Sequence, residues 1–246
     1  MATYTYPSLG NLGSSVVQTG SYLSSYWHQD VRPFSLSGTQ NINLHLFGMS
    51  ADGDDADLRL YRDSNNNGYL DSTDQFLSSS ARGGNGEDSI NYQAGTGNYL
   101  AVVDRYALGS DQYLPYSINL SATYGASNQL PNETSVGNLN YDRTFYDYVG
   151  NTDTTDTYSF SLSSYEGVNI RLAGLSSDAD IRIIRDYNNN RIVDSNEVLR
   201  SSTLGGTSSD SINNFNDSGN FFLQVYQYSG NTSYNVTFDH YPTWFA

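Results

Sequence analysis

The sequence predicts an all-β protein built from two antiparallel β-sandwiches in tandem. Tyrosine and phenylalanine are abundant, at 22 and 10 of 246 residues, and aromatic residues favour strands over helices. Short segments in which polar and apolar residues alternate recur along the chain, with clusters of turn-forming residues between them. The second half of the chain also repeats the first, so one domain is present twice.

The predicted strands of the first half follow one another at short intervals. Residues 41–46 (NINLHL) and 57–62 (DLRLYR) alternate polar and apolar side chains, as half-buried strands do. Residues 99–103 (YLAVV) form an apolar run typical of a fully buried strand, and residues 116–120 (YSINL) alternate again. Because no long stretch has the period of an amphipathic helix, the pattern favours sandwiches over helical packing.

Matching segments in the two halves occur in the same order, which predicts two copies of one domain rather than isolated similar motifs. We place the domains at residues 1–125 and 126–246, joined near a polar, proline-containing segment at residues 125–132. The matching segments are 34–37 with 160–163, 57–63 with 180–186, 88–91 with 210–213, and 97–100 with 219–222.

A calcium-binding loop is predicted at residues 63–74 (DSNNNGYLDSTD). EF-hand loops supply oxygen ligands from positions 1, 3, 5, 7, 9 and 12, with glycine at position 6. Gly68 fills the glycine position and Leu70 can pin the loop to the core. One departure is the aspartate at position 12, which reaches an ion less easily than glutamate. The alternative is an ordinary Asn/Asp/Gly-rich turn. The predicted ligands are Asp63, Asn65, Asn67, Tyr69 through its backbone carbonyl, Asp71 and Asp74.

The second half carries a related loop at residues 186–197 (DYNNNRIVDSNE). Its position 12 is the longer glutamate, but its position 6 is Arg191 instead of glycine. If the turn needs a positive φ, arginine costs about 1 kcal/mol there. We expect Ca²⁺ in this loop as well; the alternative is a copy that keeps the turn and has lost the metal. The predicted ligands are Asp186, Asn188, Asn190, Ile192 through its carbonyl, Asp194 and Glu197.

Further aspartates lie just before the first loop, at Asp52, Asp54, Asp55 and Asp57. They either contribute to a further calcium site or form a solvated loop, and the second reading is slightly favoured. Asp57 differs from the others because it recurs as Asp180. This pair either assists the ion or caps a turn.

The charge of the chain excludes several classes of function. Eleven basic and 26 acidic residues give a net charge of −15, so binding to nucleic acid through phosphate contacts is not expected. Cysteine is absent, which excludes disulfides and thiol chemistry. No apolar run is long enough to span a bilayer.

Catalytic motifs are also missing from the sequence, so we predict a protein that is not an enzyme. The three histidines do not form an H-E-x-x-H pair, and no G-x-S-x-G elbow is present. His45 falls on the polar side of an alternating strand, which predicts an exposed structural residue. A hydrolase that uses an unrecognised acidic site remains an alternative.

Each half of the chain resembles the bacterial pre-peptidase C-terminal domain. The resemblance rests on residues 55–61 (DADLRLY), which run into the Asp/Asn/Gly loop, on residues 97–103 (GNYLAVV), and on their counterparts in the second half. It implies a jelly-roll-like β-sandwich, an extracellular location and calcium-dependent stability. The family usually accompanies a secreted peptidase, and related domains of collagenases bind collagen or target insoluble substrates. No catalytic domain accompanies the resemblance here.

Together these features predict a non-catalytic, calcium-binding structural or adhesive protein of the extracellular space or cell surface. The alternative is a module that targets a secreted hydrolase to collagen or polysaccharide. Alternating tyrosines such as Tyr4 and Tyr6 either fill the core and rim or bind sugars and neighbouring subunits. Strand addition by the chain ends, residues 4–6 and 241–245, would build a homo-oligomer or polymer. Expected partners are therefore further copies of the chain and a polysaccharide or protein matrix.

Overall fold

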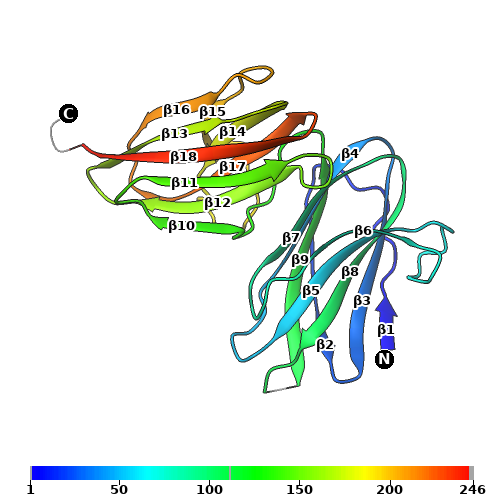
Figure 1. Ribbon diagram of the computed structural model, residues 1–246. Coiled ribbons are helices and arrows are strands. Elements are labelled where there is room, and N and C mark those ends of the chain that lie inside the picture. The colour runs from blue at the N-terminus through cyan, green and yellow to red at the C-terminus, as the bar shows by residue number, and fades with distance from the viewer. Residues whose placement is uncertain (1, 111, 244–246) are drawn as a thin grey trace. The chain divides into compact units, whose positions relative to one another are not determined.

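The computed structural model describes residues 2–110 and 112–243. These residues form eighteen β-strands and no helix, which confirms the predicted all-β class (Figure 1). The chain divides into two compact units with the boundary between Tyr124 and Gly125. None of the described segments forms a helix that could cross a membrane.

The first unit is a sandwich of two sheets. The five-stranded sheet has the order β1-β3-β8-β5-β6, and the four-stranded sheet has the order β2-β9-β4-β7. The strands are β1 (Ala2–Thr5), β2 (Val17–Ser24), β3 (Trp27–Leu36), β4 (Gln40–Phe47), β5 (Asp55–Arg62), β6 (Gln75–Ser80), β7 (Asp88–Ala94), β8 (Gly97–Ala107) and β9 (Tyr113–Thr123).

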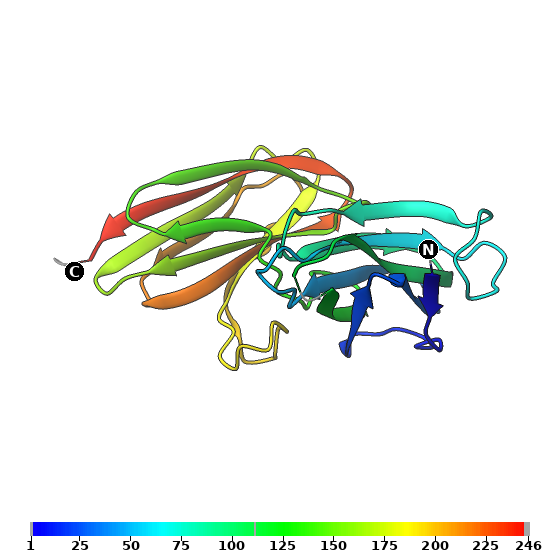
Figure 2. The same cartoon turned by 90° about the horizontal axis from the view of Figure 1, so that it is seen from below.

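The second unit repeats this topology strand for strand. Its sheets have the orders β10-β12-β17-β14-β15 and β11-β18-β13-β16, and its strands also lie in two layers (Figure 2). The strands are β10 (Thr134–Asn138), β11 (Arg143–Val149), β12 (Thr155–Leu162), β13 (Glu166–Ala173), β14 (Asp178–Ile184), β15 (Val198–Ser202), β16 (Asp210–Phe215), β17 (Gly219–Ser229) and β18 (Thr232–Pro242).

Each core lies between the two sheets of its own unit. In β4 the alternate residues Ile42, Leu44 and Leu46 are buried in the first core, and in β13 Val168 and Ile170 are buried in the second. This alternation places every second side chain on the face that packs against the partner sheet. Each fully buried Leu or Ile side chain contributes about 1.5–3 kcal/mol to the free energy of unfolding.

The central strand β8 is apolar on both faces, as its sequence predicts. Leu100 and Val102 point away from the main core and form a small cluster with Val31. Leu70, from the predicted calcium loop, packs against this cluster. The loop is therefore attached to the outer face of the five-stranded sheet through its eighth position.

The structure corrects two expectations. His45 is fully buried rather than exposed, because its ring stacks on Phe47 with 4.6 Å between ring centroids and its Nε2 lies 3.0 Å from Glu87 Oε2. Strand pairing is not wholly antiparallel, because β1 pairs with β3 in parallel, as β10 does with β12. The N-terminal strand is thus docked on its own unit; the C-terminal segment predicted to dock includes Trp244 and Phe245, which lie outside the described residues.

Candidate functional site

The two predicted calcium loops occupy equivalent places in the two units. Residues 63–74 connect β5 to β6, and residues 186–197 connect β14 to β15. In both cases the loop leaves the five-stranded sheet and returns as its edge strand. The repeat in sequence therefore corresponds to a repeat in position.

Backbone amides hold the first and last acids of the first loop. The Asp63 carboxylate accepts hydrogen bonds from the amides of Asn67 at 3.2 Å and Gly68 at 2.8 Å. The Asp74 carboxylate accepts one from the Ser64 amide at 3.0 Å. Each carboxylate oxygen retains a lone pair, so the two acids are positioned by the loop while remaining able to bind a cation.

Three further side chains meet inside the loop. The Nδ2 groups of Asn65 and Asn67 donate to Asp71 Oδ2 at 2.9 and 2.8 Å. Hydrogen bonds from Thr73, followed by those from the two asparagines, hold the pKa of Asp71 well below its usual value. Ligand positions 3, 5 and 9 are therefore already gathered, and Asp71 is an anion at neutral pH.

The second loop repeats these contacts. Its first acid, its last acid and its position-3 asparagine bond to groups at the same loop positions as in the first loop. The contacts are Asn190 N to Asp186 Oδ1 at 3.1 Å, Arg191 N to Asp186 Oδ2 at 3.0 Å, Tyr187 N to Glu197 Oε1 at 2.8 Å, Asp194 N to Glu197 Oε2 at 2.9 Å, and Asn188 Nδ2 to Asp194 Oδ2 at 2.8 Å.

The donor set of each loop suits Ca²⁺, which takes about six to eight oxygen ligands from carboxylates, amides, backbone carbonyls and water. Within the described part of the chain, no three His, Cys, Asp or Glu side chains are grouped as a metal site; two ligand positions of each loop are asparagines. For the amides of Asn65 and Asn67 to bind an ion, they must turn their oxygens toward it, since their nitrogens now face Asp71.

Position 6 has a left-handed backbone in both loops. Gly68 has φ of 74° and Arg191 has φ of 62°. The Arg191 guanidinium donates to Leu130 O at 3.1 Å and to Asn132 Oδ1 at 3.4 Å, and lies 5.4 Å from the centroid of the Phe222 ring. The arginine thus fixes the second loop to the segment that precedes β10.

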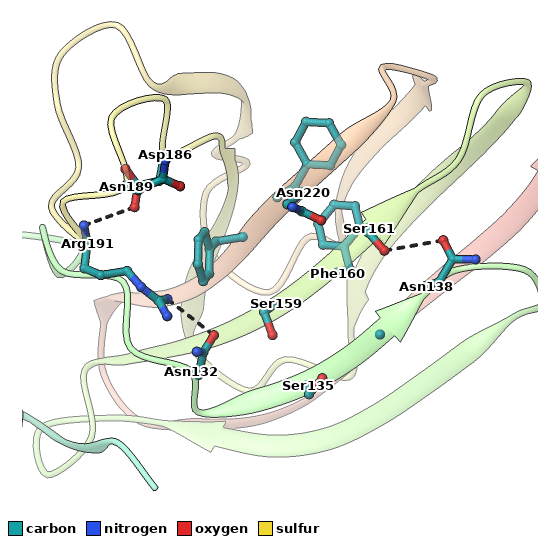
Figure 3. Close-up of a pocket in the computed structure, with 13 residues that line it drawn as sticks. Asn132, Ser135, Asn138, Ser159, Phe160, Ser161, Asp186, Asn189, Arg191 and Asn220 are labelled. Atoms are coloured by element: carbon teal, nitrogen blue, oxygen red, sulfur yellow. Dashed lines mark hydrogen bonds between the residues drawn. The ribbon is translucent and has the colours of Figure 1, made fainter. Parts of the chain in front are cut away.

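A polar pocket of about 370 Å³ lies beside the second loop (Figure 3). Ser159 and Ser161 of β12 and Asn220 of β17 form part of its lining, and Arg191 extends along one side toward Asn132. Its size falls in the range of roughly 300–1,000 Å³ typical of ligand clefts, but its lining is more polar than most. The adjoining loop also contributes Asp186.

The first unit has a different, aromatic pocket of about 190 Å³. Tyr4, Tyr22 and Trp27 contribute aromatic rings, with Tyr4 and Trp27 meeting edge to face at 5.8 Å. Ser21 and Asp30 add polar groups, and Asp30 is only 2 % exposed. Tyr4 stands out in the sequence through its alternation with Tyr6, but Trp27 and Asp30 do not, because the parallel pairing of β1 with β3 is what brings them together.

The two units differ most in the buried polar groups near this position. In the first unit, the Nη1 of buried Arg32 donates to the Tyr116 hydroxyl at 2.7 Å, and that hydroxyl donates to Asp30. In the second unit Tyr158 takes the place of the arginine. The first unit therefore buries a carboxylate beside a guanidinium, whereas the second has a phenol in the place of the cation.

Two carboxyl groups of the second unit are strongly perturbed. Burial raises the pKa of Asp153 to about 8, and the charges of Glu133 and Asp147 add to the shift. Burial also raises the pKa of Asp156 well above its usual value, with Asp153 and Glu133 contributing. Both groups hold protons at neutral pH more readily than ordinary aspartates.

Two of the four aspartates before the first loop are buried rather than solvated. Asp54 and Asp55 are buried, with exposed fractions of 0 % and 7 %. Amides from distant glycines reach both carboxylates, Gly109 N to Asp54 at 2.9 Å and Gly84 N to Asp55 at 2.9 Å. The expectation of a solvated loop is therefore wrong for these two residues, because chain segments remote in sequence cover them.

Comparison with known proteins finds one family match, over part of the second unit. Residues 154–227, which run from the start of β12 into β17 and include the second loop, match the bacterial pre-peptidase C-terminal domain. No curated protein matches the chain.

Several solved structures are similar to parts of the chain. One is the pre-peptidase C-terminal domain of a collagenase from Bacillus anthracis, with 18 % identity, 50 % of this chain and 95 % of that chain covered, and a TM-score of 0.33. Another is PliG from Aeromonas hydrophila, a periplasmic inhibitor of g-type lysozyme, with 13 % identity, 50 % and 100 % coverage, and a TM-score of 0.36.

Proposed function

We propose that the chain is a non-catalytic protein of the extracellular space or cell surface, with a structural or adhesive role, whose two β-sandwiches are each stabilised by Ca²⁺. One observation carries this proposal. The loops are identical at ligand positions 1, 3, 5 and 9 and both acidic at position 12, yet they differ at positions 2, 6, 7, 8 and 11. The side chains predicted to bind the ion keep their chemical type, while most of the others have changed.

Calcium would act by neutralising the carboxylates that each loop gathers. Asp63, Asp71 and Asp74 repel one another when no cation is present, so the first loop resists closing. A cation that binds only the closed loop adds its binding energy to the free energy of unfolding. If the ion dissociates at roughly 10⁻⁴ M, as extracellular modules do, 10 mM Ca²⁺ contributes about 2.7 kcal/mol per site.

Thermal unfolding with 10 mM CaCl₂ and with excess EDTA tests the proposal. For a unit of this size, about 2.7 kcal/mol corresponds to a rise of roughly 10 °C in Tm. Asp63→Ala should abolish the shift in the first unit alone and Asp186→Ala in the second alone, so each unit serves as the control for the other. An EDTA scan that overlays the calcium scan would show that both loops are ordinary turns.

Self-association is the second part of the proposal, and it follows from the structural role. Because β1 is already paired within its own sandwich, polymer formation would use the outer edges of the sheets or the exposed tyrosines. Light scattering of a concentrated sample with calcium tests this directly. A compact monomer under those conditions would leave the protein a single adhesive module.

A polysaccharide-targeting module is the second candidate, and the aromatic pocket of the first unit favours it. Its rings offer flat apolar faces to the C–H groups of a sugar, and Ser21 offers a hydrogen-bonding group. At about 190 Å³, it has room for one ring rather than for a drug-sized ligand. Sedimentation with insoluble polysaccharides should show binding that Trp27→Ala removes and that Tyr148→Ala, in the second unit, leaves intact. Equal binding by both variants would exclude the pocket.

A further inference from the structure

A second set of buried aspartates lies outside the calcium loop of the first unit. Asp88, at the start of β7, is fully buried, and its Oδ1 accepts hydrogen bonds from Ser80 Oγ at 2.5 Å and the Arg82 amide at 2.9 Å. Asp55, at the start of β5, is 7 % exposed, and its Oδ2 accepts one from the Gly84 amide at 2.9 Å. Both aspartates therefore hold the loop between β6 and β7.

The second unit reproduces these contacts with the same atoms. Asp210 Oδ1 accepts hydrogen bonds from Ser202 Oγ at 2.5 Å and the Leu204 amide at 2.9 Å. Asp178 Oδ2 accepts one from the Gly206 amide at 2.8 Å. The arrangement has been kept in both copies although side chains of the loop have changed, as from arginine to leucine at the position whose amide is used.

The other oxygen of each of these four aspartates is buried and has no hydrogen-bond partner among the described residues. The atoms are Asp55 Oδ1, Asp88 Oδ2, Asp178 Oδ1 and Asp210 Oδ2. Such an oxygen loses its hydration without compensation, which costs free energy. Holding the loop does not explain this cost, since an asparagine Oδ1 would accept the same hydrogen bonds and bring no negative charge.

A third aspartate adds negative charge near each pair. Burial raises the pKa of Asp88 to about 6, and the charges of Asp57 and Asp55 contribute to the shift. In the second unit burial raises the pKa of Asp180 to about 6, with Asp210 and Asp178 contributing. The three carboxylates of each unit are thus close enough to repel one another, and a water molecule would not relieve that repulsion.

We propose that each unit binds a divalent cation of the calcium class between these aspartates, at Asp55 and Asp88 in the first unit and at Asp178 and Asp210 in the second. Each site is separate from the loop at residues 63–74 or 186–197. Since no three acidic side chains are already grouped as a metal site in the described residues, two carboxylate oxygens form the core of the site. Backbone carbonyls and water complete the shell, as Ca²⁺ commonly permits.

Calcium stoichiometry tests this proposal independently of the loops. The full chain is stripped of metal and titrated with CaCl₂ against a chromophoric chelator. We expect four ions per chain, two in the loops and two in the aspartate pairs. Asp88→Asn with Asp210→Asn should lower the number to two, because the amide keeps Oδ1 as acceptor and removes the charge. Asp63→Ala with Asp186→Ala should also leave two, and the combined variant none.

The outcomes separate the two proposals. A wild-type chain that binds two ions and loses both in the loop variant overturns the aspartate sites and leaves the loop proposal standing. Two ions that persist in the loop variant and disappear in the asparagine variant establish the aspartate sites and overturn the loops. If the double asparagine variant does not fold, Asp210→Asn alone must lower the wild-type number by one, and an unchanged number refutes the second site.

Discussion

Arg191 allows two opposing effects to be measured at one position. Its left-handed backbone, with φ of 62°, costs a non-glycine residue about 1–2 kcal/mol. Glycine would remove that strain, but it adds about 0.5–1 kcal/mol of conformational entropy to the unfolded chain. The backbone balance therefore favours Arg191→Gly by only about 0.5 kcal/mol.

The side chain of Arg191 acts in the other direction. A charged hydrogen bond to Leu130 O contributes about 1.5 kcal/mol at the low end of its range, which we reduce to about 1 because the arginine is only half-buried. The contact with Phe222 adds about 0.5–1 kcal/mol. Arg191→Gly should therefore destabilise the second unit by about 1 kcal/mol, and Arg191→Ala, which keeps the strain, by about 2 kcal/mol.

Equilibrium unfolding in urea with excess EDTA measures these differences without a contribution from bound metal. Hydrogen exchange of the β12 and β17 amides assigns the transition to the second unit. Gly68→Ala is the matched control for strain alone: its new Cβ would meet only Pro33 Cγ at 3.9 Å, so it should cost about 0.5–1 kcal/mol. A glycine variant at least as stable as wild type would refute the reasoning, because the arginine contacts would then contribute less than the strain they accompany.

Three further predictions concern other charged residues. The folded state raises the pKa of Asp153 from 3.8 to about 8. Protonated Asp153 therefore contributes to the free energy of unfolding at low pH, and this contribution is lost as the pH rises from about 4 to 8, by at most about 1.4 kcal/mol per pH unit. Asp153→Asn should flatten the profile of urea midpoints between pH 5 and pH 8. Asp74→Glu should raise the calcium affinity of the first loop several-fold in calorimetry, because the longer acid reaches the ion with both oxygens. Arg32→Met should destabilise the first unit by about 3–5 kcal/mol at pH 7, because it leaves the buried Asp30 carboxylate without its cation; a loss below 1 kcal/mol in urea unfolding would contradict this.

The features that sequence predicted well are those encoded over short distances. Alternation within β4 and the apolar run in β8 indicate strands without reference to the rest of the chain. The loop at residues 63–74 is likewise contiguous, so its hydrogen-bonding positions are readable from spacing alone, and Gly68 indicates the left-handed turn. Whether the loop binds Ca²⁺ stays a prediction.

Features that depend on residues far apart in the chain could not be predicted from the sequence. His45 looks exposed from the alternation of its own strand, but Glu87 lies more than forty residues later in the chain and bonds to it. The burial of Asp55 depends in the same way on Gly84, a residue of another loop. Alternation assigns a side chain to one face of a sheet and does not show whether that face is covered.

The attachment of the second loop to the connecting chain determines how tension would travel through the molecule. Residues 128–132 precede β10, and two backbone hydrogen bonds join them to the loop, Leu130 N to Arg191 O at 3.1 Å and Val193 N to Asn128 O at 2.9 Å. A pull on the chain between the units must break these bonds before it reaches β10. If this loop binds Ca²⁺ as proposed, the ion would also strengthen the attachment of residues 128–132 to the second unit.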